Sequence, residues 1–241
     1  AFLTIGRGNE AFYRGYGVSA RRLFSAPYYV DNDRFAAAAQ ALAPEREVLR
    51  QRWQVPEGAV CLLYAGKLEP KKRILDLLDA LRQVVQGGGP AVHLLVVGTG
   101  ELMDQARARV AEHRLPVSFA GFLNQTEMPA AYVAADCLVL PSDFGETWGL
   151  VVNEAMACGK PALVSDRVGC GPDLITPGET GAMFPFGDVA ALAAQITALA
   201  NDPPALVRMG HQARQRVMDG YSVRRAVAGV LDAVRFATTR A

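Results

Sequence analysis

The sequence predicts a doubly wound α/β domain, in which helices cover both faces of a parallel sheet, with additional helices at the C-terminal end. Two observations predict this fold class. From residue 60 onward, short runs rich in aliphatic and β-branched residues alternate with segments of helical periodicity. These runs are apolar at almost every position, as strands of a parallel sheet are when helices bury both faces.

The expected strands and helices alternate along the chain. Strands are predicted at residues 60–65, 92–97, 117–120, 136–140, 161–165 and near 182–184. Helices between them are predicted at residues 74–85, at 101–112, after Thr126 as a capping residue, and at 150–158. Gly159 and Pro161 end the last of these, because glycine accepts a left-handed cap and proline cannot continue a helix.

Three further helices are predicted near the C-terminal end, at residues 189–199, 205–218 and 222–237. The breaks between them are predicted at Asp202-Pro203-Pro204 and at Gly220. We expect these helices to pack outside the sheet.

The first 50 residues follow a different pattern. Residues 2–5 are typical of a strand but have no neighbour in the sequence to pair with, and residues 9–17 are rich in aromatic residues and glycine. Residues 27–32 have extended character. We interpret residues 1–50 as a linker and remnant of a preceding domain, and residues 51–241 as the α/β domain. The chain is therefore expected to come from a longer protein.

The composition is that of an ordinary globular protein. Of 241 residues, 51% are hydrophobic and 20% are charged, and the net charge of +1 gives no reason to expect nucleic acid or an acidic membrane as a general partner. No apolar run reaches the ~20 residues of a membrane span, so a cytoplasmic protein is expected. Scattered histidines and the absence of a CxxC pair predict no metal site. We interpret the cysteines as reduced core thiols: Cys61, Cys137, Cys158 and Cys170.

Two lysines follow the first strand of the predicted sheet. Ligands of open parallel sheets bind beyond the carboxyl ends of the strands, where Lys67 lies directly after Gly66. Lys72 lies near the start of the next helix, where the helix dipole disfavours a cation. These positions favour binding of a diphosphate. The alternative is a solvated basic turn.

Gly98-Thr99-Gly100 follows the next strand and begins like a dinucleotide-binding fingerprint. Met103 stands in place of the third glycine, and the strand at 117–120 ends without an acidic residue for a ribose, which argues against a dehydrogenase. The glycines would instead permit a tight turn and close approach to a ligand or to another loop. No P-loop sequence is present, which argues against a P-loop ATPase. Phe122 would lie beside a base or pack in the core.

Glu146 and Glu154 enclose a turn from a loop into a helix. If Glu154 lies in the helix, a rise of 1.5 Å per residue separates the two by roughly 10–12 Å. A hydrolytic pair of carboxyl groups lies about 5–9.5 Å apart. The two glutamates are therefore interpreted as acceptors for different parts of one long ligand, such as a nucleotide-sugar, with the amides of residues 147–150 directed at its phosphates. The alternatives are a surface carboxylate for Glu146 and a solvent-facing helix residue for Glu154.

Four motifs occur together in the chain: Gly66-Lys67 with Lys72, Gly98-Thr99-Gly100-Glu101, Phe119-Ala120-Gly121-Phe122, and Glu146 to Glu154 running into Ala155-Met156-Ala157-Cys158-Gly159-Lys160-Pro161. With these motifs the chain resembles the retaining glycosyltransferases of the GT-B fold, family 4, and specifically their C-terminal donor-binding domain. The resemblance covers roughly residues 55–200. It implies a Rossmann-like sheet that forms the C-terminal half of a GT-B fold.

The resemblance also implies an activity. It implies metal-independent, retaining transfer of a sugar from a nucleoside-diphosphate sugar, with UDP-sugars favoured, to an acceptor hydroxyl in bacterial polysaccharide, lipopolysaccharide or glycolipid synthesis. No cofactor is implied. Lys67 and Lys72 would bind the diphosphate, Glu146 the sugar and Glu154 the ribose, and Phe122 would lie by the base. The complete implied donor site is Gly66, Lys67, Lys72, Gly98, Gly100, Phe122, Glu146, Thr147, Trp148, Gly149, Leu150 and Glu154, with Glu146, Lys72 and Lys67 as its catalytic residues.

The chain departs from the family pattern at two positions. Lys67 replaces the usual arginine and offers a point charge instead of a bidentate fork. Arg73 stands where glycine is usual, which restricts the loop. In addition, the family's acceptor-binding domain precedes this one. The chain alone is therefore expected to bind the donor and to transfer little sugar. The acceptor, a glycan or a lipid-linked glycan, is expected to bind through the preceding domain, as is any membrane.

Two other functions are compatible with a fold of this class. One is a non-catalytic nucleotide-binding or regulatory module, although such a module has no need of the sugar-facing Glu146. The other is a sugar-nucleotide epimerase, for which the sequence shows no clear acid/base set.

Overall fold

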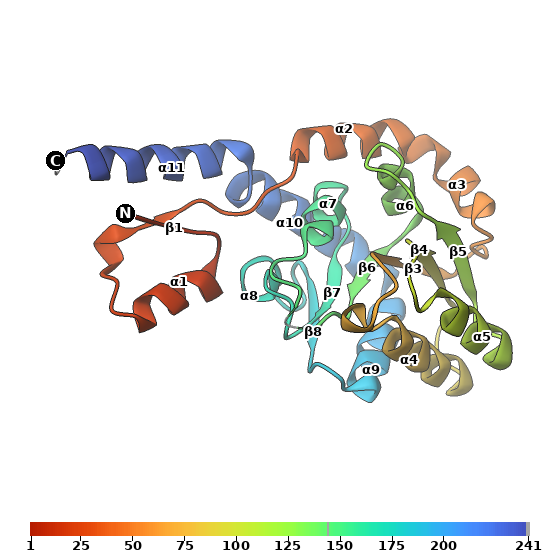
Figure 1. The fold of residues 1–241 in the computed structure, drawn as a ribbon. Helices are drawn as coiled ribbons and strands as arrows, with labels where there is room; N and C mark the ends of the chain where they lie inside the picture. Colours follow the sequence, from red (N-terminus) through yellow and green to blue (C-terminus); the bar gives the residue numbers. More distant parts are fainter. Residues whose placement is uncertain (144, 240–241) are drawn as a thin grey trace.

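The computed structural model describes residues 1–143 and 145–239 and has a main α/β body with a smaller lobe beside it (Figure 1). Six parallel strands form the main sheet, in the order β5-β4-β3-β6-β7-β8. Their bounds are β3 (Val60–Ala65), β4 (Val92–Val97), β5 (Val117–Gly121), β6 (Cys137–Leu140), β7 (Ala162–Ser165) and β8 (Gly181–Phe184). The strand order reverses between β3 and β6, which is where parallel sheets of this kind bind ligands. The predicted doubly wound fold is confirmed.

Alternate residues of β3 face opposite helix layers. Leu62 and Tyr64 pack with α4 (Ile74–Gln86) and α9 (Val189–Ala200), whereas Cys61 and Leu63 belong to the cluster on the other face. That second layer contains α2 (Asn32–Leu42), α3 (Arg46–Arg52), α6 (Met128–Ala134) and α7 (Leu150–Ala157). Because both faces are covered, every residue of β3 and β4 is buried, as their apolar sequences predict.

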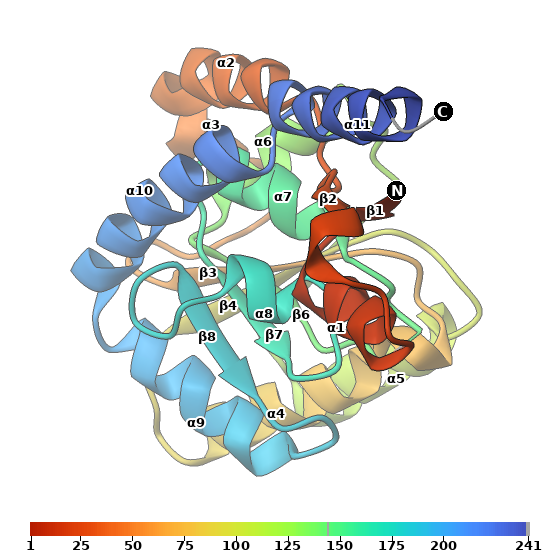
Figure 2. The same ribbon diagram turned by 90° about the vertical axis from the view of Figure 1, so that its left-hand side faces the viewer.

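The remaining helices of the main body lie at its edges. α5 (Met103–His113) contacts α4. α10 (Pro203–Gly220) contacts α2, α7 and α9, and Figure 2 shows it leading to α11 (Val223–Thr238). The shorter elements are η2 (Ala43–Glu45), η3 (Pro70–Lys72) and α8 (Gly171–Leu174). None of the helices within the described ranges combines the length and apolar character that crossing a bilayer requires.

Three predicted helix boundaries are wrong, each for a local reason. Thr126 does not cap α6, because the side chain of Asn124 accepts the amides of Thr126 and Glu127 and the helix starts only at Met128. α5 begins at Met103, two residues later than predicted. α10 includes Pro203, Pro204 and Gly220, which were predicted as breaks, because the Asp202 side chain caps the helix and proline is tolerated in a first turn.

The predicted strand at the start of the chain does have a partner, so its expected isolation is wrong. β1 (Phe2–Thr4) pairs in parallel with β2 (Leu23–Ser25), with α1 (Arg7–Gly15) and η1 (Ala20–Arg22) between them. α11 contacts both strands, and these elements form the smaller lobe (Figure 1). Two segments from opposite ends of the sequence thus share one lobe.

The segment from residue 32 to residue 52 is helical. It forms α2, η2 and α3, which pack on the main sheet, with Phe35 buried in the core. Residue 50 therefore falls inside a helix of the main body. The origin of residues 1–50 in a preceding domain stays a prediction.

The four cysteines are free and buried, as predicted. Burial raises the pKa of each thiol, to about 12 for Cys61. They are packing residues of the two helix layers and the sheet.

Candidate functional site

A cavity of about 730 Å³ lies at the carboxyl ends of the strands, between the loops after β3, β4 and β5 and the first half of α7. Half of the predicted site residues line it: Gly66, Lys67, Gly98, Gly100, Phe122 and Glu154. Phe122 is 74% exposed, so its ring is available to a ligand and is not a core residue. The loops after three strands therefore converge as the sheet topology predicts.

The two glycines of Gly98-Thr99-Gly100 allow the loop after β4 to approach the loop after β3 closely. Gly98 has a φ of +125°, and a Cβ atom on it would lie 1.9 Å from the carbonyl oxygen of Gly66. A Cβ on Gly100 would lie 2.4 Å from the carbonyl oxygen of Leu68, whose amide donates to the Thr99 carbonyl at 3.0 Å. The glycines therefore permit the approach of another loop and shape the cavity wall, and their close approach to a ligand stays a prediction.

The two predicted phosphate-binding lysines occupy different positions. Lys67 is exposed at the cavity. Lys72, at the end of η3, forms an ion pair with the carboxylate of Glu146, and both side chains are largely buried. The structure therefore brings Lys72 and Glu146 together, although they are distant in sequence.

Arg73 adopts the conformation that a glycine would favour. Its φ of 54° and ψ of 35° lie in the left-handed region. Its guanidinium pairs with Asp76 at 2.7 Å and lies 5.4 Å above the ring of Phe186. The backbone of Arg73 is therefore strained, and the contacts with Asp76 and Phe186 hold the residue in this conformation.

The loop ahead of α7 is fixed through its backbone. The amide of Gly169 donates to the Glu146 carbonyl at 3.1 Å, and the amide of Cys170 donates to the Trp148 carbonyl at 2.9 Å. Gly149, with a φ of +99°, then starts α7, and the exposed Leu150 is its first residue. In the part of the chain that is described, the amides of Leu150 and Val151 have no acceptor, as expected of a helix N-terminus.

Trp148 does not line the cavity. Its ring is buried against Tyr28 and Tyr221, with centroids 5.8 Å and 6.0 Å away, and its indole N–H donates to Asn153 Oδ1 at 2.9 Å. The ring anchors the turn that carries Glu146 and Thr147. An aromatic residue in a loop motif gives no signal of which way its ring points, so the sequence could not reveal this.

Glu154 is a buried carboxylate at the cavity wall, and its interpretation as a solvent-facing residue is wrong. It is 8% exposed, and its Oε2 accepts a hydrogen bond from the Tyr132 hydroxyl at 2.7 Å. Burial raises the pKa of Glu154, while the Tyr132 bond and the charge of Arg34 act in the opposite direction. Burial and Glu154 raise the pKa of Tyr132, so this hydroxyl remains a donor.

Sequence reasoning missed Tyr132 and Arg34. Tyr132 lies in an apolar helix, where a tyrosine is typical of core packing. Arg34 lies far away in the sequence, and its Nη1 donates to the Gln125 carbonyl at 3.2 Å at the rim of the cavity. A polar group in an otherwise apolar run was the one signal that could have identified Tyr132.

The described residues contain no group of three or more His, Cys, Asp or Glu side chains able to hold a metal ion. The prediction that no cofactor or metal is needed stays a prediction.

The six-stranded parallel sheet, whose strand order reverses between β3 and β6 beside the cavity, is the fold of a GT-B glycosyltransferase domain. The chain belongs to the glycosyl transferases group 1 family, whose sequence pattern matches residues 45–216. It is 36% identical over 166 residues to a glycogen synthase from Mycobacterium tuberculosis, covering 68% of this chain and 39% of that protein. It is 37% identical over 160 residues to a GDP-mannose-dependent alpha-mannosyltransferase from the same organism, covering 66% and 37%.

Solved structures agree on the fold. Anabaena Alr3699/HepE in complex with UDP has a TM-score of 0.80 at 20% identity, over 97% of this chain and 63% of that one. Sucrose-phosphate synthase from Thermosynechococcus elongatus has a TM-score of 0.75 at 25% identity, over 99% and 58%. The chain spans less than two fifths of the length of the two curated relatives above.

Proposed function

We propose that this chain binds the nucleotide-sugar donor of a retaining glycosyltransferase, which transfers the sugar to an acceptor hydroxyl. The buried carboxylate of Glu154 carries the proposal, because it lines a cavity between strand-end loops and its one hydrogen-bond donor among the described side chains is Tyr132. A buried carboxylate that faces a cavity is costly unless further donors reach it. The hydroxyls of a ribose are such donors.

The remaining groups fit the other parts of the ligand. Lys67 at the cavity and the amides at the start of α7 supply positive charge for a diphosphate. Phe122 offers an exposed ring to the base. A diphosphate that draws Lys72 toward it would release Glu146 to accept a hydroxyl of the sugar.

The chemistry proposed is stabilisation of the leaving diphosphate. Lys67, Lys72 and the helix amides would offset the charge that develops on it, and we propose that this suffices without a metal ion. In the retaining mechanism that the family resemblance implies, attack and departure occur on the same face, and the leaving phosphate assists deprotonation of the acceptor hydroxyl.

The family resemblance and the named relatives bear on the base and the biological context. The family resemblance favours a UDP-sugar, whereas one relative at 37% identity is named for GDP-mannose. We propose a role in bacterial polysaccharide, lipopolysaccharide or glycolipid synthesis, with the acceptor bound by a preceding domain. The chain by itself is expected to bind the donor and to transfer little or no sugar.

Calorimetric titration of UDP, GDP and ADP, first with EDTA and then with magnesium, tests the proposal. We expect one nucleotide to bind without metal, and Lys72→Ala and Lys67→Ala to weaken it. Lys71→Ala is the matched control, because this neighbouring lysine pairs with Glu69 at 3.3 Å instead of facing Glu146. Binding that none of these substitutions changes would place the nucleotide elsewhere and contradict the proposed site.

A further inference from the structure

A second cavity lies at the amino ends of the strands of the main sheet, opposite the carboxyl ends where the first cavity lies. Its volume is about 380 Å³, and α2, α3, α10 and the loop from α7 to β7 enclose it. Three cations from three different elements line it, namely Arg46, Lys160 and Arg214. His211 and the carboxylate of Asp136 also line it. This cavity shares no described lining residue with the first one.

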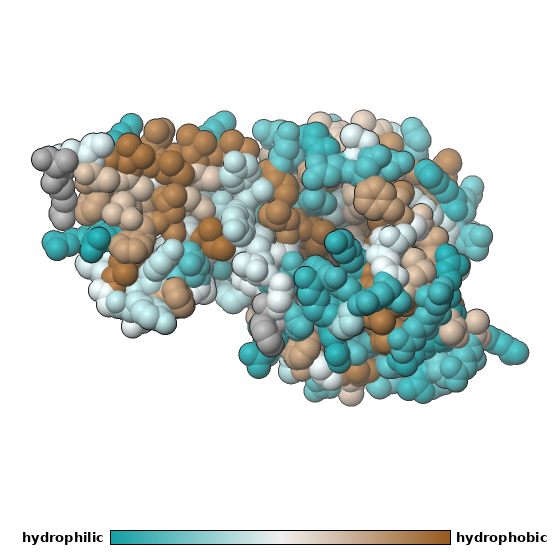
Figure 3. All heavy atoms as spheres, in the orientation of Figure 1, coloured by the Kyte–Doolittle hydropathy of each residue, from teal (hydrophilic) through white to brown (hydrophobic). Residues whose placement is uncertain are grey.

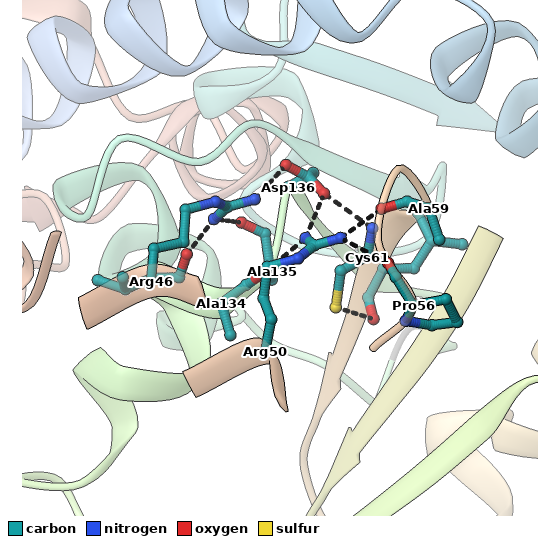
Figure 4. A network of polar contacts seen from close by, with 10 residues as sticks. Arg46, Arg50, Pro56, Ala59, Cys61, Ala134, Ala135 and Asp136 are labelled. Carbon is teal, nitrogen blue, oxygen red and sulfur yellow. Dashed lines mark hydrogen bonds and ion pairs between the residues drawn. The ribbon is translucent and has the colours of Figure 1, made fainter. Parts of the chain in front are cut away.

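The charge of Asp136 is already offset by two arginines (Figure 4). Asp136 Oδ1 accepts a hydrogen bond from Arg46 at 2.7 Å. Asp136 Oδ2 accepts one hydrogen bond from Arg50 at 3.3 Å and another from the Cys61 amide at 2.8 Å. The two guanidinium groups also donate to main-chain carbonyls, including that of Ala135 at 3.0 Å. Two cations share one carboxylate in this network, so the oxygens of Asp136 are already paired and, among the described residues, form no ion pair with a further cation of the cavity.

Lys160 and Arg214 have no such partner. Across residues 1–143 and 145–239, no carboxylate lies within 4.0 Å of either side chain. Lys160 is half-buried, and burial together with Arg46 lowers its pKa to about 8, against the opposing effect of Asp136. A cation that is partly desolvated without a counter-ion costs stability, and an external anion would offset this cost.

Helix electrostatics explain only part of this cluster. Lys160 follows the C-terminus of α7, where a cation is favoured by the helix dipole. That effect does not account for Arg214 and His211, which come from the middle of α10 and line the same cavity. Convergence of cations from separate elements on one cavity is the pattern of an anion site.

We propose that this cavity binds a small phosphomonoester, with its phosphate between Lys160 and Arg214. Guanidinium and ammonium groups are the side chains that proteins use for phosphate, and the volume of the cavity is within the range of small-molecule sites. Gln40, also at the wall, offers an amide to the rest of the ligand. The proposal does not depend on the proposed donor site, because the two cavities lie at opposite ends of the strands.

Calorimetry with inorganic phosphate and with glucose 6-phosphate tests the site, using the Lys72→Ala protein to weaken binding in the first cavity. Binding is expected to persist in that protein. Adding Lys160→Gln or Arg214→Gln is expected to weaken it roughly 10-fold or more, the effect of losing one charge-assisted contact. Arg208→Gln is the matched control, because Arg208 lies on the same helix, faces Asp202 at 3.6 Å and is not at the cavity.

Chemical labelling of the unsubstituted chain gives a second readout that does not depend on variant folding. Acetic anhydride modifies unprotonated amines, so Lys160 is expected to react readily near pH 8 and to be protected by glucose 6-phosphate, as seen by mass spectrometry. No protection of Lys160 at millimolar ligand would overturn the proposal. So would phosphate binding that Lys72→Ala abolishes and Lys160→Gln leaves intact.

Discussion

Lys72 Nζ forms an ion pair with Glu146 Oε2, which joins the loop after β3 to the loop before α7. Their side chains are 17% and 15% exposed, so the pair is shielded from solvent. The two residues have different expected ligands, the diphosphate for Lys72 and the sugar for Glu146. The pair therefore links the two halves of the proposed donor site, and each partner is available to a ligand once the other is engaged elsewhere.

Glu146→Gln is expected to separate the affinity for a nucleotide from that for a nucleotide-sugar. Removing the carboxylate frees Lys72 for phosphate, so the affinity for the bare nucleoside diphosphate should stay the same or increase. The nucleotide-sugar should lose a charged hydrogen bond, worth about 1.5–3 kcal/mol or roughly tenfold and more in affinity. Calorimetry with both ligands measures the difference.

Glu101→Gln is the control for this comparison, since Glu101 lies just after Gly100 and is exposed. Equal losses for both ligands in Glu146→Gln would favour the non-catalytic nucleotide-binding module over the transferase.

Tyr132→Phe is expected to weaken nucleotide binding roughly two- to tenfold, the effect of one ordinary hydrogen bond. Without the hydroxyl, Glu154 loses its hydrogen-bond donor at 2.7 Å. Because this bond lowers the pKa of Glu154 and burial raises it, loss of the bond raises the pKa further. Its carboxylate then accepts a ribose hydroxyl less well. A nucleotide that lacks both ribose hydroxyls provides the control, because wild type and variant should bind it equally weakly. Unchanged affinity for the ordinary nucleotide would show that Glu154 does not contact the ribose.

The stability of the fold should decrease as the pH falls from about 6.5 toward 4, because of His93. Burial, with Arg50 nearby, lowers the pKa of His93 from 6.5 to about 4. Within this window the unfolded chain binds the proton and the folded chain does not, so stability present above pH 6.5 is lost on acidification. The loss attributable to His93 is on the order of 3 kcal/mol.

Urea unfolding of wild type and of His93→Leu between pH 4 and pH 7 measures this effect. The stability of the variant should fall less steeply with pH, because other groups still titrate. Parallel curves for the two proteins would mean that His93 does not carry the dependence.

Arg73→Gly is expected to be more stable than Arg73→Ala by about 1 kcal/mol, because the left-handed conformation at a φ of 54° is strained for any side chain with a Cβ atom. Both substitutions remove the pair with Asp76, so the comparison isolates the backbone term. Chemical unfolding of both variants gives the difference. If alanine proved as stable as glycine, the backbone at residue 73 would not be under strain.

The strands of the main sheet could be predicted because burial on both faces leaves a local signature. Every position of Val60–Ala65 and Val92–Val97 is buried, and apart from His93 both segments are apolar in the sequence. The end of α7 was equally local: Gly159 has a φ of +73°, and its amide returns to the Met156 carbonyl, as a glycine cap requires.

Capping choices were harder to predict. The sequence predicts Thr126 as the cap of α6. In the structure the Asn124 side chain instead accepts hydrogen bonds from the amides of Thr126 and Glu127 in the turn ahead of α6, and no described side chain caps the helix itself. Such differences amount to about 1 kcal/mol, which a pattern of residue types does not resolve.

The sequence by itself determined that the chain forms a parallel α/β sheet of this family, and that lysines and glutamates are placed at its strand ends. Only the tertiary structure decided which of them meet: Lys72 pairs with Glu146, and Glu154 pairs with Tyr132. It also decided that Trp148 faces away from the cavity and that β1 pairs with β2. The physical reason is that periodicity and caps are short-range, whereas partners distant in the chain are chosen by packing of the whole fold.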